Sequence, residues 1–495
     1  MRRHPLTDEQ KAVATSQAPL VFVESVPGSG KTTVAAERFG VLRYHLLGAD
    51  PRGVVAVSFA RSAVAELRRR TRRRWGGRTT ARPNGVMTMD ALHRGVVEFL
   101  LHTGTIQWPG GIVTPKLIDS WARQRGASRV SPTGPRNQRW ELALNGTTVA
   151  VDYRAVDSPC WGMQYARRQD YVDSLIEGVC THDEIRQLVG VALGRPGLRS
   201  AIDDYISRSI AHLIVDEAFD LNGLDALLVR RVIESGVEVT LVGDPWQALY
   251  EWRGARPDMV HRLLADHSFR TLPMRHSFRF KSDQTRGLAD GLRSGNPCTL
   301  EPSNGSAEVV LASEWDHLQA PGSDTIPLSF GQLDCQTDAS IALLLDHVAS
   351  ARLGERALNV TEALRCLRRD AESIDLGAPV SMLRDPAIPL PDVMDALRLA
   401  TKVGEVRRPS LPGKRVASRL DRLAMLREWL TLNRSYIPGL SFHQAKGREW
   451  HRVDVVLDTG AQQAVRAGLD QTDEEHRKIY VGLTRASEST RIRVA

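Results

Sequence analysis

The chain has 495 residues, with 42% hydrophobic and 25% charged positions, so it exceeds one compact core and predicts roughly three or four globular units. The net charge of +8 suits a polyanionic partner. Arginine supplies almost all of the positive charge, and a GC-rich genome would give the same excess of arginine. The five cysteines are scattered and form no C-x-x-C pair, which disfavours a disulfide framework and a zinc site. No apolar run approaches the ~20 residues that span a membrane, which disfavours a membrane partner. We therefore expect a cytoplasmic protein.

Short β-branched runs that end in a turn and lead into a helical pattern recur along the chain. They predict strands at residues 19–24, 54–59, 212–215, 238–242 and 453–457. Because strands that alternate with helices form parallel sheets, the sequence predicts an α/β fold.

Two regions, 96–205 and 352–435, break this alternation and are predicted to be mostly helical. We therefore predict two α/β cores, each interrupted by an insertion. The predicted parts are 1–95 and 206–270 for the first core, 96–205 for its insertion, 271–351 and 436–495 for the second core, and 352–435 for its small insertion.

The segment SVPGSGKT, residues 25–32, lies between a predicted strand and a predicted helix. A glycine-rich turn there lets backbone N–H groups and the helix N-terminus face a phosphate. Lys31 would reach the β- and γ-phosphates of a nucleotide, and the Thr32 hydroxyl would bind Mg²⁺. The alternative is a glycine-rich turn that happens to precede a lysine. The residues expected to bind the nucleotide here are Pro27, Gly28, Ser29, Gly30, Lys31, Thr32 and Thr33.

A pair of acidic residues follows the apolar run HLIV. Asp216 at a strand end would bind Mg²⁺, and Glu217 would orient or deprotonate an attacking water. Alone, such a pair would more often be a solvated turn. Together with an upstream phosphate loop it indicates a nucleotide-hydrolysing site.

Nine segments, in the order of the chain, resemble the motifs of UvrD/Rep-like superfamily 1A helicases. The alternative is a different phosphate-loop protein, such as a nucleotide kinase, which would not need the segments after residue 240. The nine segments are LTDEQ, SFARSAVAELRRR, TMDAL, VDEAFDLN, VGDPWQALYEWRGA, HSFRF, CQTDASIALLL, LSFHQAKGREWHRVDVV and EEHRKIYVGLTRA, besides the phosphate loop. The resemblance implies RecA-like cores 1A and 2A, with insertions 1B and 2B, that bind ATP and Mg²⁺.

The resemblance also assigns nucleotide-site roles. Gln10 would read the adenine edge, Phe278 would stack on the adenine, and Gln247 would sense the γ-phosphate. Arg279 and Arg485 would bring positive charge from the second core to the transferring phosphoryl group. Gly447 and Glu449 would connect the strand-binding segment to the nucleotide.

Single-stranded DNA contacts follow from the same resemblance. Phe59, Tyr250 and Trp252 would stack on bases, and Arg253 would anchor the loop that carries Trp252. The strand-binding residues would also include Arg61, His443 and Lys446. The arginines of the run 68–74 suit a solvated helix end and a DNA backbone equally well.

The resemblance implies an ATP-dependent translocase or helicase, moving 3′ to 5′ on single-stranded or tailed duplex DNA, in repair, recombination or anti-phage defence. The alternative is a DNA-sensing ATPase that regulates a nuclease or other partner subunit without unwinding, as in small UvrD-like subunits of Gabija-type systems. Three departures bear on this choice: Phe219 replaces a usual glutamine, Thr33 replaces an arginine that faces the adenine, and the sequence stops ten residues after Arg485.

Overall fold

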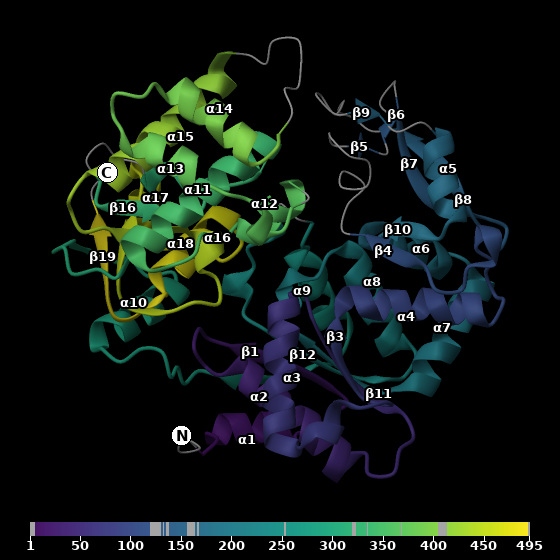
Figure 1. The fold of residues 1–495 in the computed structure, drawn as a ribbon. Helices are drawn as coiled ribbons and strands as arrows, with labels where there is room; N and C mark the ends of the chain where they lie inside the picture. Colours follow the sequence, from purple (N-terminus) through teal and green to yellow (C-terminus); the bar gives the residue numbers. More distant parts are fainter. Residues whose placement is uncertain are drawn as a thin grey trace. The chain divides into compact units, whose positions relative to one another are not determined.

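The computed structural model describes residues 5–118, 130–131, 133–134, 138–155, 164–165, 168–251, 254–318, 323–333, 335–367, 369–403 and 413–493. The chain divides into two compact units, Met1–Arg279 and Phe280–Ala495. Figure 1 traces the first in purple to teal and the second in teal to yellow. Among the residues just given, no helix is both long and apolar enough to cross a bilayer.

The first unit is built on a parallel sheet of six strands in the order β13-β1-β12-β11-β2-β3. These strands are β1 (Leu20–Ser25), β2 (Gly53–Ser58), β3 (Gly85–Thr88), β11 (Ile210–Asp216), β12 (Glu238–Gly243) and β13 (Arg270–Met274). Strands β2 and β11 are buried along their whole length, which explains their continuous apolar runs. Strand β13 pairs with β1, so residues that we assigned to the second core lie in the first unit.

Helices cover both faces of this sheet. They are α1 (Asp8–Thr15), α2 (Lys31–Val41), α3 (Arg61–Trp75), α4 (Met89–His102), α8 (Gly223–Glu234) and α9 (Pro257–Asp266), and a π-helix, η1 (Leu42–Leu46), continues α2. Because side chains alternate along a strand, Ile214 packs in a cluster with α1, α2 and α3, while Leu213 and Val215 pack with α4, α8 and α9. In Figure 1, α2 and α3 lie side by side.

The region 96–205 contains more strand than its sequence predicted. Its elements are β4 (Lys116–Ile118), β5 (Val130–Ser131), β6 (Thr133–Gly134), β7 (Gln138–Asn145), β8 (Thr148–Ala155), β9 (Gln164–Tyr165), α5 (Arg168–Ile176), β10 (Val179–Thr181), α6 (His182–Leu193) and α7 (Pro196–Ser209). Strands β7 and β8 form an antiparallel hairpin in which Asn145 pairs with Thr148. Gly146 begins the two-residue loop with a φ of 59°, a conformation that favours glycine.

The second unit is built on another parallel sheet of six strands, in the order β14-β19-β18-β15-β17-β16. The strands are β14 (Glu301–Pro302), β15 (Val309–Ala312), β16 (Thr325–Pro327), β17 (Ile437–Ser441), β18 (Trp450–Val456) and β19 (Ala486–Arg493). The helices near these strands in sequence are α10 (Asp283–Arg293), α11 (Gln336–Leu353), α16 (Phe442–Ala445), α17 (Thr459–Ala467) and α18 (Glu474–Leu483).

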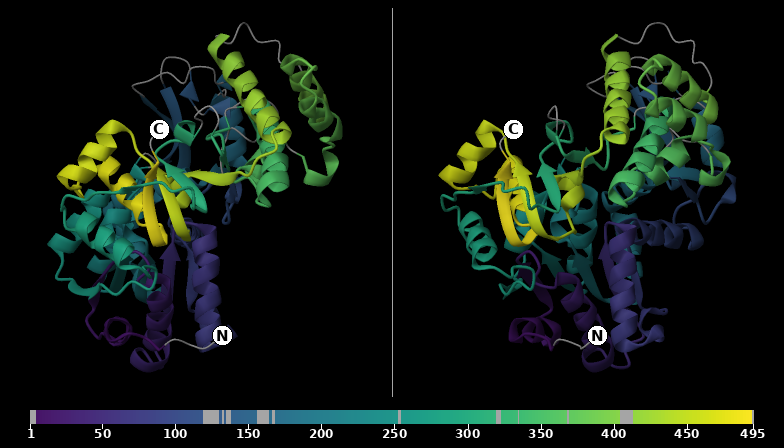
Figure 2. Two further views of the ribbon diagram at one scale, coloured as in Figure 1. Left: turned by 90° about the vertical axis from the view of Figure 1, so that its left-hand side faces the viewer. Right: turned by 60° about the vertical axis from the view of Figure 1, so that its left-hand side comes forward.

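The described part of region 352–435 is helical, with α12 (Val360–Leu367), α13 (Gly377–Arg384), α14 (Leu390–Ala400) and α15 (Gly413–Thr431). Leu383, Leu397 and Leu423 from three of these helices meet α11 in one buried cluster. Figure 2 shows these light green helices grouped apart from the yellow strands of the same unit. All five predicted strands coincide with observed strands, and the prediction of an α/β fold with two parallel cores is confirmed.

Candidate functional site

The predicted phosphate loop joins β1 to α2. Gly28 and Gly30 have φ angles of 74° and 85°, in the left-handed region that glycine tolerates without a Cβ penalty. Gly30 precedes the first residue of α2, Lys31, and has no side chain to cap the helix. The first backbone N–H groups of α2 and its dipole therefore favour an anion at this turn.

The loop is held by backbone neighbours from distant segments. Ser25 takes the place of the usual first glycine, and its buried hydroxyl donates to the Gly243 carbonyl at 2.9 Å. The Val26 N–H donates to the Met274 carbonyl at 3.1 Å. The substitution at Ser25 thus connects the phosphate loop to the end of β12.

Residues 277–279 lie directly against the loop. The Phe278 N–H donates to the Gly28 carbonyl at 3.0 Å, and the Ser277 hydroxyl donates to the Pro27 carbonyl at 2.7 Å. A Cβ on Gly28 would lie 2.5 Å from the Cβ of Arg279, so this close approach requires glycine. Arg279, which we expected from the second core, is the last residue of the first unit and lies beside the phosphate loop.

The two predicted carboxylates follow β11. Asp216 is buried, and the backbone N–H of Glu217 donates to its carboxylate at 3.1 Å. Glu217 has a φ of 56°, which is uncommon for a residue with a side chain, and its carboxylate lies 4.0 Å from the ammonium of Lys31. Burial and the Glu217 charge raise the pKa of Asp216 to about 7, and Lys31 opposes this rise.

Gln247 comes from the strand between these two features. β12 pairs with β1 and with β11, so its carboxyl end lies between the phosphate loop and the carboxylates. The turn η6 (Pro245–Gln247) follows it, and the Gln247 side chain donates to the Asp244 carboxylate at 2.6 Å. Both side chains are buried, so the amide is held at the end of the sheet.

Three side chains gather around Gly30. The Gln10 amide donates to the Ser29 carbonyl at 3.0 Å, and its position is set by a capping box with Thr7 at the start of α1. An ideal Cβ on Gly30 would lie 2.8 Å from Gln10 Nε2 and 3.9 Å from the Phe278 ring and the Thr33 Cβ. Because 49% of Phe278 is exposed, a ring face is available to a planar ligand beside the phosphate loop.

The donor set suits Mg²⁺ better than a metal held by protein alone. The part of the chain that the structure describes has no group of three or more His, Cys, Asp or Glu side chains placed to hold a metal. Mg²⁺ typically keeps several waters and binds one or two protein ligands together with substrate phosphates. A hydroxyl from Thr32 and the buried carboxylate of Asp216 could supply those protein ligands.

Phe219, which takes the place of a usual glutamine, packs in the core beside Gly243 at the end of β12. Its side chain is 2% exposed, lies edge-on to Phe22 at 6.1 Å between ring centroids, and also packs on His261. Its ring fills the hydrophobic core on one face of the sheet, and the loss of one polar contact near the γ-phosphate stays a prediction.

Two of the expected contacts with single-stranded DNA in the first unit, Phe59 and Arg61, follow the end of β2. Phe59 is half-buried against the core, and Arg61 is the exposed first residue of α3. Tyr250 is half-buried, while Trp252 and Arg253 lie outside the described residues.

Several arginines of the run 68–74 have partners within the first unit. Arg69 and Arg70 pair with Glu66, Arg74 pairs with Glu37 of α2, and Arg68 donates to a backbone carbonyl of β3. The run therefore helps to pack α3 against its neighbours.

In the second unit two predicted motifs lie next to each other. α16 packs on α18, where a Cβ on Gly482 would lie 2.4 Å from the Phe442 ring. Arg485 follows α18, is fully buried, and donates from Nε to the Val481 carbonyl at 2.8 Å. The other residues predicted there are half-buried His443 and Lys446, Gly447 with a φ of 83°, and exposed Glu449.

Comparisons with known proteins relate the chain to ATP-binding proteins and DNA helicases. A family model described as "AAA domain" matches residues 9–253, and such a domain implies ATP binding. DNA helicase II of Escherichia coli (strain K12) is 23% identical over 66% of this chain and 44% of its own length. ATP-dependent DNA helicase Rep of the same organism is 25% identical over 61% and 44%, and UvrD1 of Mycobacterium leprae (strain TN) is 25% identical over 52% and 35%.

The chain thus spans less than half the length of these curated relatives and is distantly similar to superfamily 1 helicases of the UvrD and Rep kind. A solved structure, Pif1 helicase from Candida albicans, aligns over 99% of this chain and 94% of that chain at 12% identity. Its TM-score of 0.36 is too low to support a conclusion.

Proposed function

We propose that the chain is an ATPase that is stimulated by single-stranded DNA and moves along it. The observation that carries this proposal is the meeting of three features at the carboxyl ends of adjacent parallel strands: the phosphate loop after β1, Gln247 after β12, and the Asp216–Glu217 pair after β11. Ligands of parallel α/β sheets bind at such strand ends.

Each group has a role in phosphoryl transfer. Lys31 and the N–H groups of the loop bind the phosphates, and Glu217, within 4.0 Å of the Lys31 ammonium, orients and deprotonates the attacking water. Thr32 and Asp216 would hold Mg²⁺, which neutralises charge on the phosphates when it is bound. Gln247 and Arg279 act on the γ-phosphate, and Arg485 adds positive charge from the second unit, a contribution typically worth about 10³–10⁵ in rate.

Helix α3 provides a physical link between a bound DNA strand and the nucleotide within the first unit. It begins at Arg61, beside Phe59, and packs along α2, whose first residue is Lys31. A strand bound at Phe59 and Arg61 would therefore bias the helix that carries the phosphate-binding lysine. Movement from 3′ to 5′, with His443 and Lys446 as further strand contacts, is part of this proposal.

The second candidate is a DNA-sensing ATPase that regulates a partner protein, such as a nuclease, without unwinding. Both candidates predict ATP hydrolysis that depends on DNA. They differ on a duplex with a single-stranded 3′ tail: only the translocase releases the shorter strand as ATP is consumed. A role in repair, recombination or anti-phage defence would follow from the partner found.

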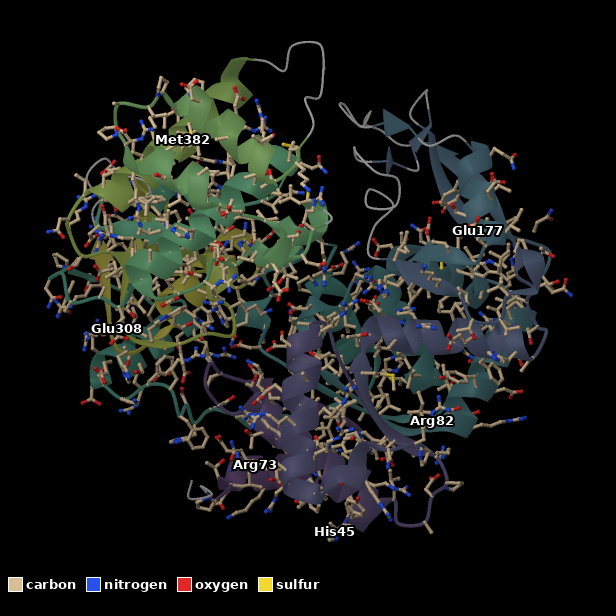
Figure 3. The ribbon with its side chains drawn as sticks, viewed as in Figure 1. His45, Arg73, Arg82, Glu177, Glu308 and Met382 are labelled. Atoms are coloured by element: carbon tan, nitrogen blue, oxygen red, sulfur yellow. The ribbon has the colours of Figure 1, made fainter. Side chains whose placement is uncertain are left out.

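The central experiment measures ATP hydrolysis by the full chain with and without an oligothymidylate strand. We expect stimulation by the strand in the wild type and loss of about 10² or more in kcat for Lys31→Ala and Glu217→Gln, because each removes a group that acts on the transferring phosphoryl. Matched controls are Lys11→Ala and Glu177→Gln, because both residues are exposed and outside the site. Glu177 follows α5 and is labelled in Figure 3. An equal rate of ATP hydrolysis with and without the DNA strand would contradict the proposal.

A further inference from the structure

Two helical segments of the first unit end at the edge of the sheet opposite the phosphate loop. In a parallel sheet each connecting helix runs back to the start of the next strand, so α2 with η1 leads to the start of β2, and α3 leads to the start of β3. The helical rise places the two ends of α3, Arg61 and Trp75, about 21 Å apart. A surface at Trp75 is therefore separate from the DNA contacts expected at Phe59 and Arg61.

Three aromatic side chains meet at this amino edge of the sheet. The Trp75 ring packs on Gly40 of α2, where a Cβ would lie 2.0 Å from the ring. Tyr44 stacks on Trp75 with 5.9 Å between ring centroids and an interplanar angle of 25°, and His45 meets the same ring edge-on. Tyr44 and His45 both belong to the π-helix η1, a rare turn that is frequent at functional sites.

The outer ring of this group, Tyr44, is held in one orientation and is open to solvent. The Thr79 hydroxyl donates to the Trp75 carbonyl at 2.9 Å, so the Tyr44 hydroxyl donates to Thr79 at 3.0 Å. Beneath it, the Arg74 guanidinium lies 5.6 Å from the centre of the Trp75 ring. Tyr44 nevertheless remains 48% exposed. A ring that is already fixed binds a flat partner with little further loss of side-chain freedom.

Arginines without acidic partners lie beside these rings. The segment 67–88 contains eight arginines and no acidic residue. Arg72, Arg73 and Arg78 are exposed, and none of them pairs with a carboxylate among the residues that the structure describes. Arg72 precedes Trp75 by three residues and so lies on the same face of α3. Figure 3 marks Arg73 and His45 at this end of the first unit.

This combination of groups matches a single-stranded nucleic acid. Guanidinium groups bind phosphates, and an exposed aromatic ring stacks on an unpaired base. The bases of a duplex already stack on one another, so a duplex would leave the Tyr44 ring without a partner. Three arginines near a helix C-terminus also suit the helix dipole, but the dipole does not account for a fixed and exposed tyrosine ring.

We propose that the amino-edge surface, formed by Tyr44, Arg72, Arg73 and Arg78, is a second binding surface for single-stranded nucleic acid. It lies apart from the contacts expected at the carboxyl ends of the strands, where hydrolysis is proposed to occur. Its role is to raise the affinity of the chain for a strand, and binding there does not depend on ATP hydrolysis.

The test measures binding of a fluorescein-labelled oligothymidylate to the full chain by fluorescence anisotropy at several salt concentrations. For Arg72→Ala/Arg73→Ala/Arg78→Ala we expect affinity to fall about tenfold or more, and the slope of log affinity against log salt to become shallower by about 2, because three phosphate contacts are lost. For Tyr44→Ala we expect affinity to fall about tenfold through the loss of one stacked base, with the salt slope unchanged.

The controls separate stacking and local charge from general effects. Tyr44→Phe keeps the ring and should bind the strand within about twofold of the wild type. Arg199→Ala/Arg208→Ala/Arg262→Ala removes the same charge from exposed positions on α7 and α9, and should also stay close to the wild type. A blunt duplex should bind Tyr44→Ala and the wild type equally, and thermal unfolding verifies that each variant is folded.

Unchanged affinity in the triple variant at the amino edge, or in Tyr44→Ala, would overturn the inference. An equal fall in the control triple variant would assign the effect to net charge, and an equal effect of Tyr44→Ala on strand and duplex would exclude stacking; either result also overturns it. Tighter binding of polyglutamate than of the strand would assign the surface to an acidic protein instead. A strand that binds as expected but leaves ATP hydrolysis unstimulated would refute the proposed function and leave the amino-edge surface supported.

Discussion

The two parallel sheets have the same number of strands but end in different chemistry. In the first, β1 ends in the glycine-rich phosphate loop, and β11 ends in two carboxylates. In the second, β17 passes directly into α16, and β15 is followed by the turn η8 (Asp316–Leu318). The comparison shows that the α/β scaffold supplies strand ends, while the residues that follow each strand decide which sheet can hold a nucleotide.

The two units also differ in how deeply their predicted catalytic arginines are buried. Arg279 beside the phosphate loop is half-buried, whereas Arg485 after α18 is fully buried and bonded to the Val481 carbonyl. A buried guanidinium must keep its hydrogen bonds to offset desolvation, so Arg485 also contributes to the packing of the second unit.

The largest contrast between the units is expected at two glycines. Gly28→Ala combines a φ of 74° with a Cβ 2.5 Å from that of Arg279, so the phosphate loop must shift, and a shift of about 1 Å costs on the order of 10²-fold in rate. Gly447 in the second unit has a φ of 83°, and a Cβ there would have no other atom within 4 Å. Gly447→Ala is therefore expected to cost only backbone strain of about 1–2 kcal/mol. ATP hydrolysis and thermal unfolding of both variants measure this difference; equal loss of ATP hydrolysis in the two would contradict it.

A smaller contrast is expected at the two arginines. Arg279→Ala should lower kcat and leave the unfolding temperature nearly unchanged, since its side chain is half-buried at the end of its unit. Arg485→Ala should lower both, because removing a large, fully buried side chain leaves a cavity, which typically costs about 2–5 kcal/mol. Steady-state kinetics and calorimetric unfolding distinguish the two results, and an Arg485→Ala variant of wild-type stability would show that its burial carries no structural role.

A separate effect is a pH dependence of the stability of the first unit. Burial lowers the pKa of His212 to about 4, with the Glu238 carboxylate opposing the fall, whereas an unfolded histidine titrates near 6.5. Between those values the unfolded chain binds more protons, so stability is full above about pH 6.5 and is lost as pH falls toward about 4, by up to about 3 kcal/mol.

His212→Gln should flatten this part of the stability profile, because glutamine can bond to Thr240 without titrating. Chemical unfolding of the wild type and the variant from pH 7 to pH 4.5 measures the slope, and exposed His45→Gln is the control. A slope that His212→Gln leaves intact would assign the effect to other groups.

Local sequence patterns identified most of the scaffold of the first site. β-branched runs located β1, β2, β11 and β12, and the glycines of the phosphate loop predicted the turn that the structure shows. These features succeed because each depends on a few neighbouring residues: side-chain periodicity for a strand, and positive φ for a glycine. The β7–β8 hairpin was missed even though alternating residues and Gly146 carried a local signal for it.

Other features depend on contacts between residues far apart in the chain. The sequence showed only that Phe219 replaces a usual glutamine, and packing against Phe22 and His261 places its ring in the core. The pairing of β13 with β1 brought Phe278 and Arg279 to Gly28, against the boundary predicted at residue 271.

By itself the sequence determined the phosphate loop, the carboxylate pair and the alternation of strands and helices, because these patterns are local. The tertiary structure alone decided which arginine of the run 68–74 bonds to Thr33 of α2. All of these arginines are chemically equivalent in the sequence, and only the packing of α3 on α2 brings Arg70 to Thr33 while its neighbour Arg74 reaches Glu37.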